Sequence, residues 1–123
     1  MLDGTQQSLL DLMRPPPITR PVDQGATVIR NPHEVLILPH PKMAWDSARI
    51  GLHQCEPDLW AWSTSVCTSQ GGWAYAVSPK WGRFTTTRED ALYWATQEIT
   101  ERLQSRDGFS DFAKIIKWAE GLV

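Results

Sequence analysis

Metal binding is the first chemistry that the residue types of this chain suggest. His53 and Cys55 stand two residues apart. A four-ligand set would also need Cys67 and a histidine from the N-terminal region, either His33 or His40. Structural zinc sites are built from short paired spacings such as CxxC, and this sequence contains none. We therefore expect no bound metal and no other cofactor.

Catalytic chemistry finds as little support in the sequence. A cysteine nucleophile needs a charged or basic neighbour that stabilises its thiolate, but only Ser, Thr and Val flank Cys67. The adjacent carboxylates Glu89 and Asp90 fall at an expected helix start, where the helix dipole accounts for them. Gly71-Gly72 is too short for a phosphate-binding loop and no lysine follows it at a helix start. We expect a protein that is not an enzyme.

Binding chemistry gives the strongest signal, in a stretch that we call the aromatic–basic segment, Leu59 to Arg88. It contains four of the seven tryptophans and no acidic residue, and its charges are Lys80, Arg83 and Arg88. The segment is thus locally cationic in a chain of formal net charge −2. Trp, Tyr and Arg are enriched in binding hot spots, although the same aromatic residues also build ordinary sheets.

Three strands joined by tight turns would position this segment. We expect strands at residues 48–55, 59–67 and 73–78, with turn residues at 56–58 and 70–72. The second and third strands alternate large and small side chains, which places Trp60, Trp62, Trp73 and Tyr75 on one face and Ala61, Ser63, Ala74 and Ala76 on the other. The two faces should therefore serve different purposes.

Two helices follow the strands. Thr86 and Glu89 have the spacing of a capping box, which predicts a helix that runs to Gln104. Asp107-Gly108 would end this unit, and a second helix is expected at about 109–120. The predicted fold is α+β, a three-stranded antiparallel meander packed by two C-terminal helices over residues 42–123. The helices could cover either the small-residue face or the aromatic face.

The region of residues 1–41 reads as a proline-rich arm, because it contains seven of the nine prolines. Leu9, Leu10, Leu12 and Met13 suggest a short helix at 8–13, and Pro15-Pro16-Pro17 a polyproline spacer. The apolar runs 26–29 and 35–38 could form a small hairpin. We expect this arm to be ordered only in part.

Length and hydropathy bound the remaining possibilities. A chain of 123 residues corresponds to one domain. No stretch approaches the ~20 apolar residues of a membrane-spanning helix, and the first residues lack the basic head and apolar run of a signal peptide. A cytoplasmic protein without a membrane partner is expected. Cys55 and Cys67 lie too far apart along neighbouring strands for a disulfide, so free buried thiols are predicted.

Two binding functions remain open. The first is a non-enzymatic protein that acts by protein–protein interaction, with a loop at 79–84 that displays Trp81, and with the anchors Trp81, Arg83, Lys80, Trp73 and Trp60. Trp81 and Phe84 could instead tuck beneath the first helix. The alternative is nucleic-acid binding by the aromatic face, with Trp60, Trp62, Trp73 and Tyr75 stacking on bases and Lys80, Arg83 and Arg88 contacting phosphates. Against it, a net charge of −2 is unlike that of a dedicated non-specific DNA binder.

The run GGWAYAVSPKWGRFTTTREDALYWATQEITERL, with the strand that begins near Trp60, resembles uncharacterised small modules of plasmid- and phage-borne proteins. In those modules a Trp-bearing strand, a Gly-rich turn and a "WGRF" loop lead into a helix that opens with "REDAL". The resemblance covers residues 59–103 and implies no particular chemistry. It implies a mobile-element accessory protein, for which an inhibitor of host defence such as an anti-CRISPR protein is the comparison.

Overall fold

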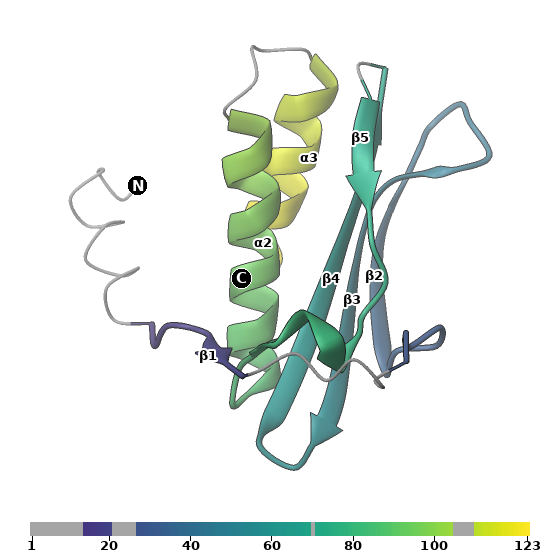
Figure 1. Cartoon of the computed structure of the whole chain (residues 1–123). Coiled ribbons are helices and arrows are strands. Elements are labelled where there is room, and N and C mark those ends of the chain that lie inside the picture. Colours follow the sequence, from purple (N-terminus) through teal and green to yellow (C-terminus); the bar gives the residue numbers. More distant parts are fainter. Residues whose placement is uncertain (1–13, 21–26, 70, 105–109) are drawn as a thin grey trace.

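The centre of the fold is a four-stranded antiparallel sheet in the order β2-β3-β4-β5, with two helices against one face (Figure 1). The computed structural model describes residues 14–20, 27–69, 71–104 and 110–123. The sheet and helices are β2 (Glu34–Pro39), β3 (Asp46–Glu56), β4 (Leu59–Thr68), β5 (Gly71–Ala74), α2 (Arg88–Gln104) and α3 (Ser110–Glu120). A second, two-stranded sheet pairs β1 (Ile18–Thr19) with β6 (Arg83–Phe84), and the 3-10 helix η1 (Pro79–Trp81) precedes β6.

The α+β class is confirmed, but the three-stranded meander is wrong because the sheet has a fourth strand. β2 comes from the region assigned to the proline-rich arm and pairs with β3, with Leu36 opposite Ile50 and Leu38 opposite Ala48. Leu36 and Leu38 pack against the core from β2, and this apolar burial favours its addition to the sheet. The expected hairpin between residues 26–29 and β2 does not form, because Ile29 bridges to Val77 instead.

The other predicted strands and helices differ from the observed ones mainly in the residues at which they begin and end. β3 and β4 extend one or two residues beyond the expected ranges and are joined by a turn at Pro57-Asp58. β5 is shorter than expected and ends at Ala74. The short helix predicted at 8–13 and the break at Asp107-Gly108 lie outside the described residues.

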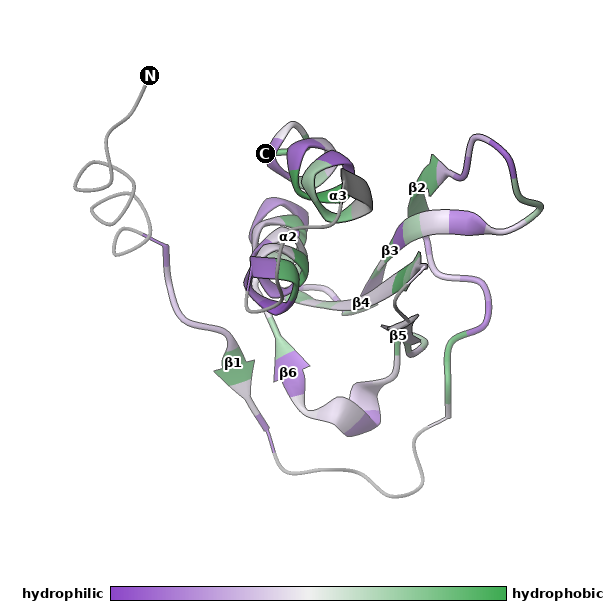
Figure 2. Ribbon diagram, turned by 90° about the horizontal axis from the view of Figure 1, so that it is seen from above, coloured by the Kyte–Doolittle hydropathy of each residue, from purple (hydrophilic) through white to green (hydrophobic). Residues whose placement is uncertain are grey.

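The helices cover the aromatic face of the sheet, which decides between the two packing arrangements that the sequence left open. Trp62 is only 4% exposed, and its cluster includes Leu92 and Ile99 of α2. Burial of large aromatic side chains removes more apolar surface from water than burial of alanine and serine would. On the opposite side of the sheet, Figure 2 shows η1 and β6, and a second cluster joins Ala61 and Phe84 there.

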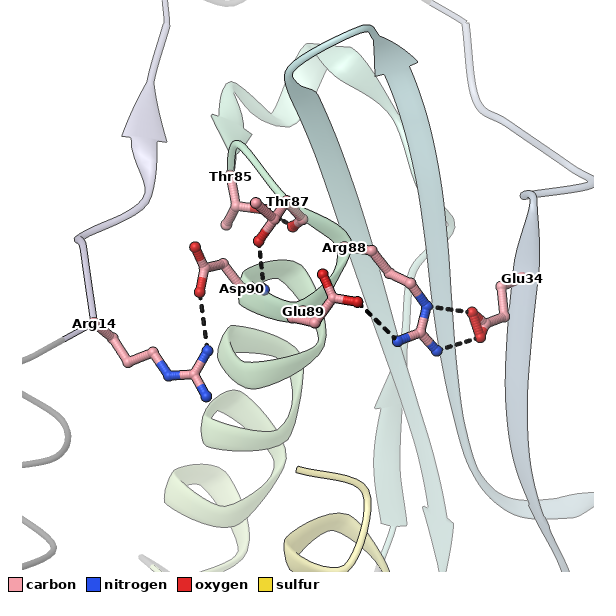
Figure 3. Close-up of polar contacts among 7 residues, drawn as sticks. All are labelled: Arg14, Glu34, Thr85, Thr87, Arg88, Glu89 and Asp90. Atoms are coloured by element: carbon pink, nitrogen blue, oxygen red, sulfur yellow. Dashed lines mark hydrogen bonds and ion pairs between the residues drawn. The ribbon is translucent and has the colours of Figure 1, made fainter.

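The start of α2 differs by one residue from the predicted capping box. Thr87, not Thr86, is the cap, because its Oγ1 accepts a hydrogen bond from the amide of Asp90 at 3.1 Å (Figure 3). Thr85 is held in an extended bridge to Trp60 by two backbone hydrogen bonds of 2.8 Å. The chain therefore turns into the helix one residue later than the sequence pattern suggests.

Two arginine–carboxylate pairs fix the start of α2 to distant parts of the chain (Figure 3). Arg88 donates from two of its nitrogens to both carboxylate oxygens of Glu34 on β2, and the Nε–Oε1 distance is 2.6 Å. Arg14 donates to Asp90 at 2.9 Å. Hydrogen bonds from Arg88 hold the pKa of Glu34 below its ordinary value of 4.5.

Candidate interaction surface

Trp81 is the most exposed of the predicted tryptophan anchors, and it lies on a rigid turn. Ser78 caps η1 by accepting a hydrogen bond from the amide of Lys80 at 3.2 Å. Gly82 follows with a φ of 72°, a left-handed conformation that glycine adopts without strain, and its amide donates to the Pro79 carbonyl. The local sequence SPKWG thus holds Trp81 at a fixed position.

The indole of Trp81 is itself held in place while much of its surface remains open. Its Nε1 donates to the carbonyl of Ala76 at 2.8 Å. Its ring lies edge to face with that of Tyr75, and the two ring centroids are 6.2 Å apart. The side chain of Lys80 lies over the same indole, with its Nζ 5.1 Å from the ring centroid. Trp81 nevertheless remains 43% exposed. We call Lys80 and Trp81 together the η1 tip.

The guanidinium of Arg83 makes an ion pair and a cation–π contact within the protein. Its NH2 lies 3.2 Å from Oε1 of Glu98, and its guanidinium lies over the ring of Trp62 at 5.0 Å. The carboxylate of Glu98 is only 10% exposed, so this ion pair is partly withdrawn from water. Phe84, the next residue, is buried in the smaller cluster opposite the helices. The loop residues predicted together thus separate into an exposed tip, the exposed but paired Arg83, and the buried Phe84.

Glu98 is the centre of a polar network that also engages two predicted aromatic residues. The hydroxyl of Tyr75 donates to Oε2 at 2.6 Å, and the hydroxyl of Thr64 donates to the same oxygen. Trp73 donates from Nε1 to Thr64 at 2.8 Å. Burial, together with the Glu98 carboxylate, raises the pKa of Tyr75 to about 12. The sequence pattern did not include Glu98, because only the fold brings α2 beside β4 and the residue after β5.

The aromatic face of the sheet, proposed for base stacking, lies under the helices. Trp62 is buried and Trp60 is partly buried against the same core. Stacking of bases requires accessible ring faces. Arg88, which was expected to contact phosphates, is paired with Glu34. Among the described residues, Lys80 alone of the three predicted phosphate-binding cations has no carboxylate partner.

An open groove lies on the other face of the sheet. It has a volume of about 430 Å³ and is bounded by the segments Ile29–Pro32 and Tyr75–Val77. Its lining from the sheet comprises Val35, Arg49, Gly51, Ser63, Ser65 and Ala74. Part of this face is the small-residue face predicted from the sequence, which was considered only as one of the two faces that the helices could cover.

The metal candidates do not assemble into a ligand set. The rings of His33 and His53 stack with their centroids 4.0 Å apart. However, Nδ1 of His33 accepts a hydrogen bond from the Gln54 amide at 3.1 Å. Burial, and then the neighbouring His33, lowers the pKa of His53. In the part of the chain that the structure describes, no three His, Cys, Asp or Glu residues form a group suited to a metal ion.

The two cysteines are free thiols, but the prediction that both are buried is wrong. Cys67 is exposed and Cys55 is partly buried. Cys67 lies near the end of β4 and lines a hollow together with Lys114 of α3, whereas Cys55 packs at the edge of the smaller apolar cluster. Burial, and then Glu56, raises the pKa of Cys55.

Comparison with known proteins gives no relative from which a role could be transferred. No protein-family model matches the chain, and searches of the curated proteins and of the solved structures found no match. Within the described ranges no helix is long and apolar enough to cross a membrane. The grounds for a function are therefore the sequence and the geometry of this chain.

Proposed function

We propose that this protein is a non-enzymatic binding protein that docks on a protein partner through the η1 tip. The observation that carries the proposal is the state of Trp81, which is held by a hydrogen bond and an aromatic contact but is 43% exposed. A preordered tryptophan loses little conformational entropy when it enters a partner's pocket. Lys80 adds a cation beside the ring.

Protein docking is favoured over nucleic-acid binding by the positions of the charged residues. Arg83 and Arg88 each have a carboxylate partner, which offsets the positive charge that the sequence assigns to this region. Phosphate contacts supply much of the affinity of nucleic-acid binders. A hot spot built on one tryptophan needs no strong positive field.

The most specific form of the proposal follows from the resemblance of residues 59–103 to modules of mobile-element proteins. In that form the partner is a component of the host's defence machinery, and the protein inhibits it in the bacterial cytoplasm. A rigid tip that fills a pocket suits inhibition by occlusion, because no chemistry is required of the inhibitor.

Trp81→Ala tests this function. We expect a loss of about 2 kcal/mol or more in partner affinity, roughly 30-fold, which is typical of a hot-spot tryptophan. The measurement is quantitative capture of partner proteins from nuclease-treated bacterial lysate, followed by titration of the captured protein. Trp45→Ala is the matched control, since Trp45 is also a tryptophan with 51% exposure but contacts His40 instead.

Both variants should keep the melting temperature of the wild type within a few degrees, because neither indole is in the core. Equal capture by Trp81→Ala and Trp45→Ala would contradict docking through the tip. A large fall in melting temperature for Trp81→Ala would show that the indole serves stability instead.

A further inference from the structure

The groove on the sheet face opposite the helices is not explained by the η1 tip. Strand register places Ile37, Arg49, Ser65 and Ala74 in one row across all four strands. The next row contains Val35, Gly51 and Ser63. Small residues occupy the middle of these rows, and the segments Ile29–Pro32 and Tyr75–Val77, which are joined by the Ile29–Val77 bridge, close over Gly51 in the second row. A ligand can therefore approach the sheet at the first row.

The groove is cationic. Its lining includes Arg30 and Arg49 and no acidic residue. In the described ranges Arg30 has no ion-pair partner, and Arg49 has a 3.5 Å contact with Asp46, which is not part of the lining. Both arginines are exposed. Because the whole chain carries a net charge of −2, this face differs in sign from the average surface.

The second row lies mostly out of reach of a ligand. Ser63 is only 8% exposed, and it stands close over Gly51, where an added Cβ would lie 2.6 Å from its Oγ. In the first row, Ala74 is exposed and Ser65 is partly exposed. A ligand therefore meets the floor of the groove chiefly at the first row.

We propose that the groove binds an extended acidic peptide segment of a protein partner. Carboxylates of the segment pair with Arg30 and Arg49. Aliphatic side chains of the segment pack on Val35 and Ile37, which are both exposed. This inference rests on the proposed protein partner but uses a different surface from the η1 tip, to which Tyr75 and Ala76 connect it.

An acidic peptide fits these features better than a nucleic acid does. Base stacking needs exposed aromatic rings, and the lining has one aromatic residue, Tyr75, whose hydroxyl is bound to Glu98. Ile37, next to Arg49 in the first row, is exposed beside the groove. Aliphatic surface flanked by arginines matches a chain that alternates apolar and acidic side chains.

A random array of 12-residue peptides, probed with the labelled full chain, tests the proposal. We expect bound peptides to be enriched in Asp and Glu and their affinity to fall as salt increases. The double variant R30Q/R49Q should weaken binding of an enriched peptide about tenfold or more. The control K114Q/K117Q removes the same charge from α3 and should bind as the wild type does.

A second variant addresses the floor of the groove independently of charge. Ser65→Leu places a larger side chain in the first row, and it should abolish peptide binding with little change in melting temperature. Ser65 is partly exposed, so it tolerates the added volume better than Ser63 would. Circular dichroism of each variant confirms that it is folded.

The proposal is overturned if the bound peptides show no acidic enrichment, or if R30Q/R49Q and Ser65→Leu both bind an enriched peptide as the wild type does. Displacement of the peptide by a single-stranded oligonucleotide of higher affinity would assign the groove to nucleic acid instead. Trp81→Ala should bind the peptide normally, so a failure of the η1 tip and a failure of the groove give different results.

Discussion

The environments of individual tryptophans differ more than their positions in the sequence suggest. Trp62 and Trp81 belong to the same acid-free stretch, yet the first is core and the second is surface. The indole N–H of Trp81 reaches the Ala76 carbonyl, whereas that of Trp62 is buried without a hydrogen-bond partner in the described part of the chain. Arg83 lies over the Trp62 ring and supplies a cation–π contact there. Residue type alone therefore does not identify a binding anchor.

Cys67 is expected to react with thiol reagents before Cys55. The thiolate is the reactive form, and burial together with Glu56 raises the pKa of Cys55. Cys67 is exposed and lines a hollow of about 300 Å³ with Lys42 and Lys114. Alkylation by iodoacetamide at pH 8, followed by mass spectrometry, should label Cys67 about tenfold faster or more.

Substitution separates the two thiols. Cys67→Ser should remove the fast phase of labelling, and Cys55→Ser should retain it. Equal rates at both positions in the wild type would show that the burial of Cys55 does not protect it.

At the scale of elements, local pattern predicted the long strands and helices well. Alternation of side chains marked β4, and helical spacing of apolar residues marked α2 as far as Gln104. β5 ends earlier than the alternation implies, because the chain beyond Ala74 leaves the sheet and Val77 pairs with Ile29. β2 was missed as a sheet strand because the prolines around it suggested an arm, although proline is tolerated at an edge strand.

The cap of α2 provides a test at this scale. Thr87→Ala should lower the free energy of unfolding by about 1 kcal/mol, because the amide of Asp90 loses its acceptor. Thr86→Ala, the neighbouring threonine, should change it by no more than a few tenths of a kcal/mol. Urea denaturation of both variants measures the difference. A larger loss for Thr86→Ala would restore the capping box predicted from the sequence.

At the scale of the whole molecule, ion pairs join segments that are far apart in the chain. Arg88 at the start of α2 binds Glu34 of β2, and Arg14 binds Asp90. These contacts connect the N-terminal third of the described chain to the helix that covers the core. The fold is therefore closed by charged contacts at one end as well as by apolar burial.

The Glu34–Arg88 pair predicts a pH dependence of stability. The folded-state pKa of Glu34 lies below 4.5 because Arg88 donates hydrogen bonds to it, so its stabilisation is present above pH 4.5 and is lost as pH falls through the folded-state value. Both side chains are about one third exposed, which limits the contribution to about 0.5–1 kcal/mol. Glu34→Gln should show this deficit at pH 7 and a smaller one at pH 3.

Urea denaturation at the two pH values measures the effect. Glu89→Gln is the control, since Glu89 is more exposed and lies 3.8 Å from the same Arg88. An equal deficit for Glu34→Gln at both pH values would show that the carboxylate charge does not contribute.

The sequence by itself determined β3, β4, α2 and α3 in their order along the chain, because side-chain alternation and helical spacing act between residues that are close in the chain. It also marked Trp81 as a candidate anchor. Only the tertiary structure decided which face the helices cover, that Arg83 and Arg88 find carboxylates, and that an acid-free groove forms opposite the helices. These outcomes depend on contacts between distant residues, such as Arg83 with Glu98, which no local pattern encodes.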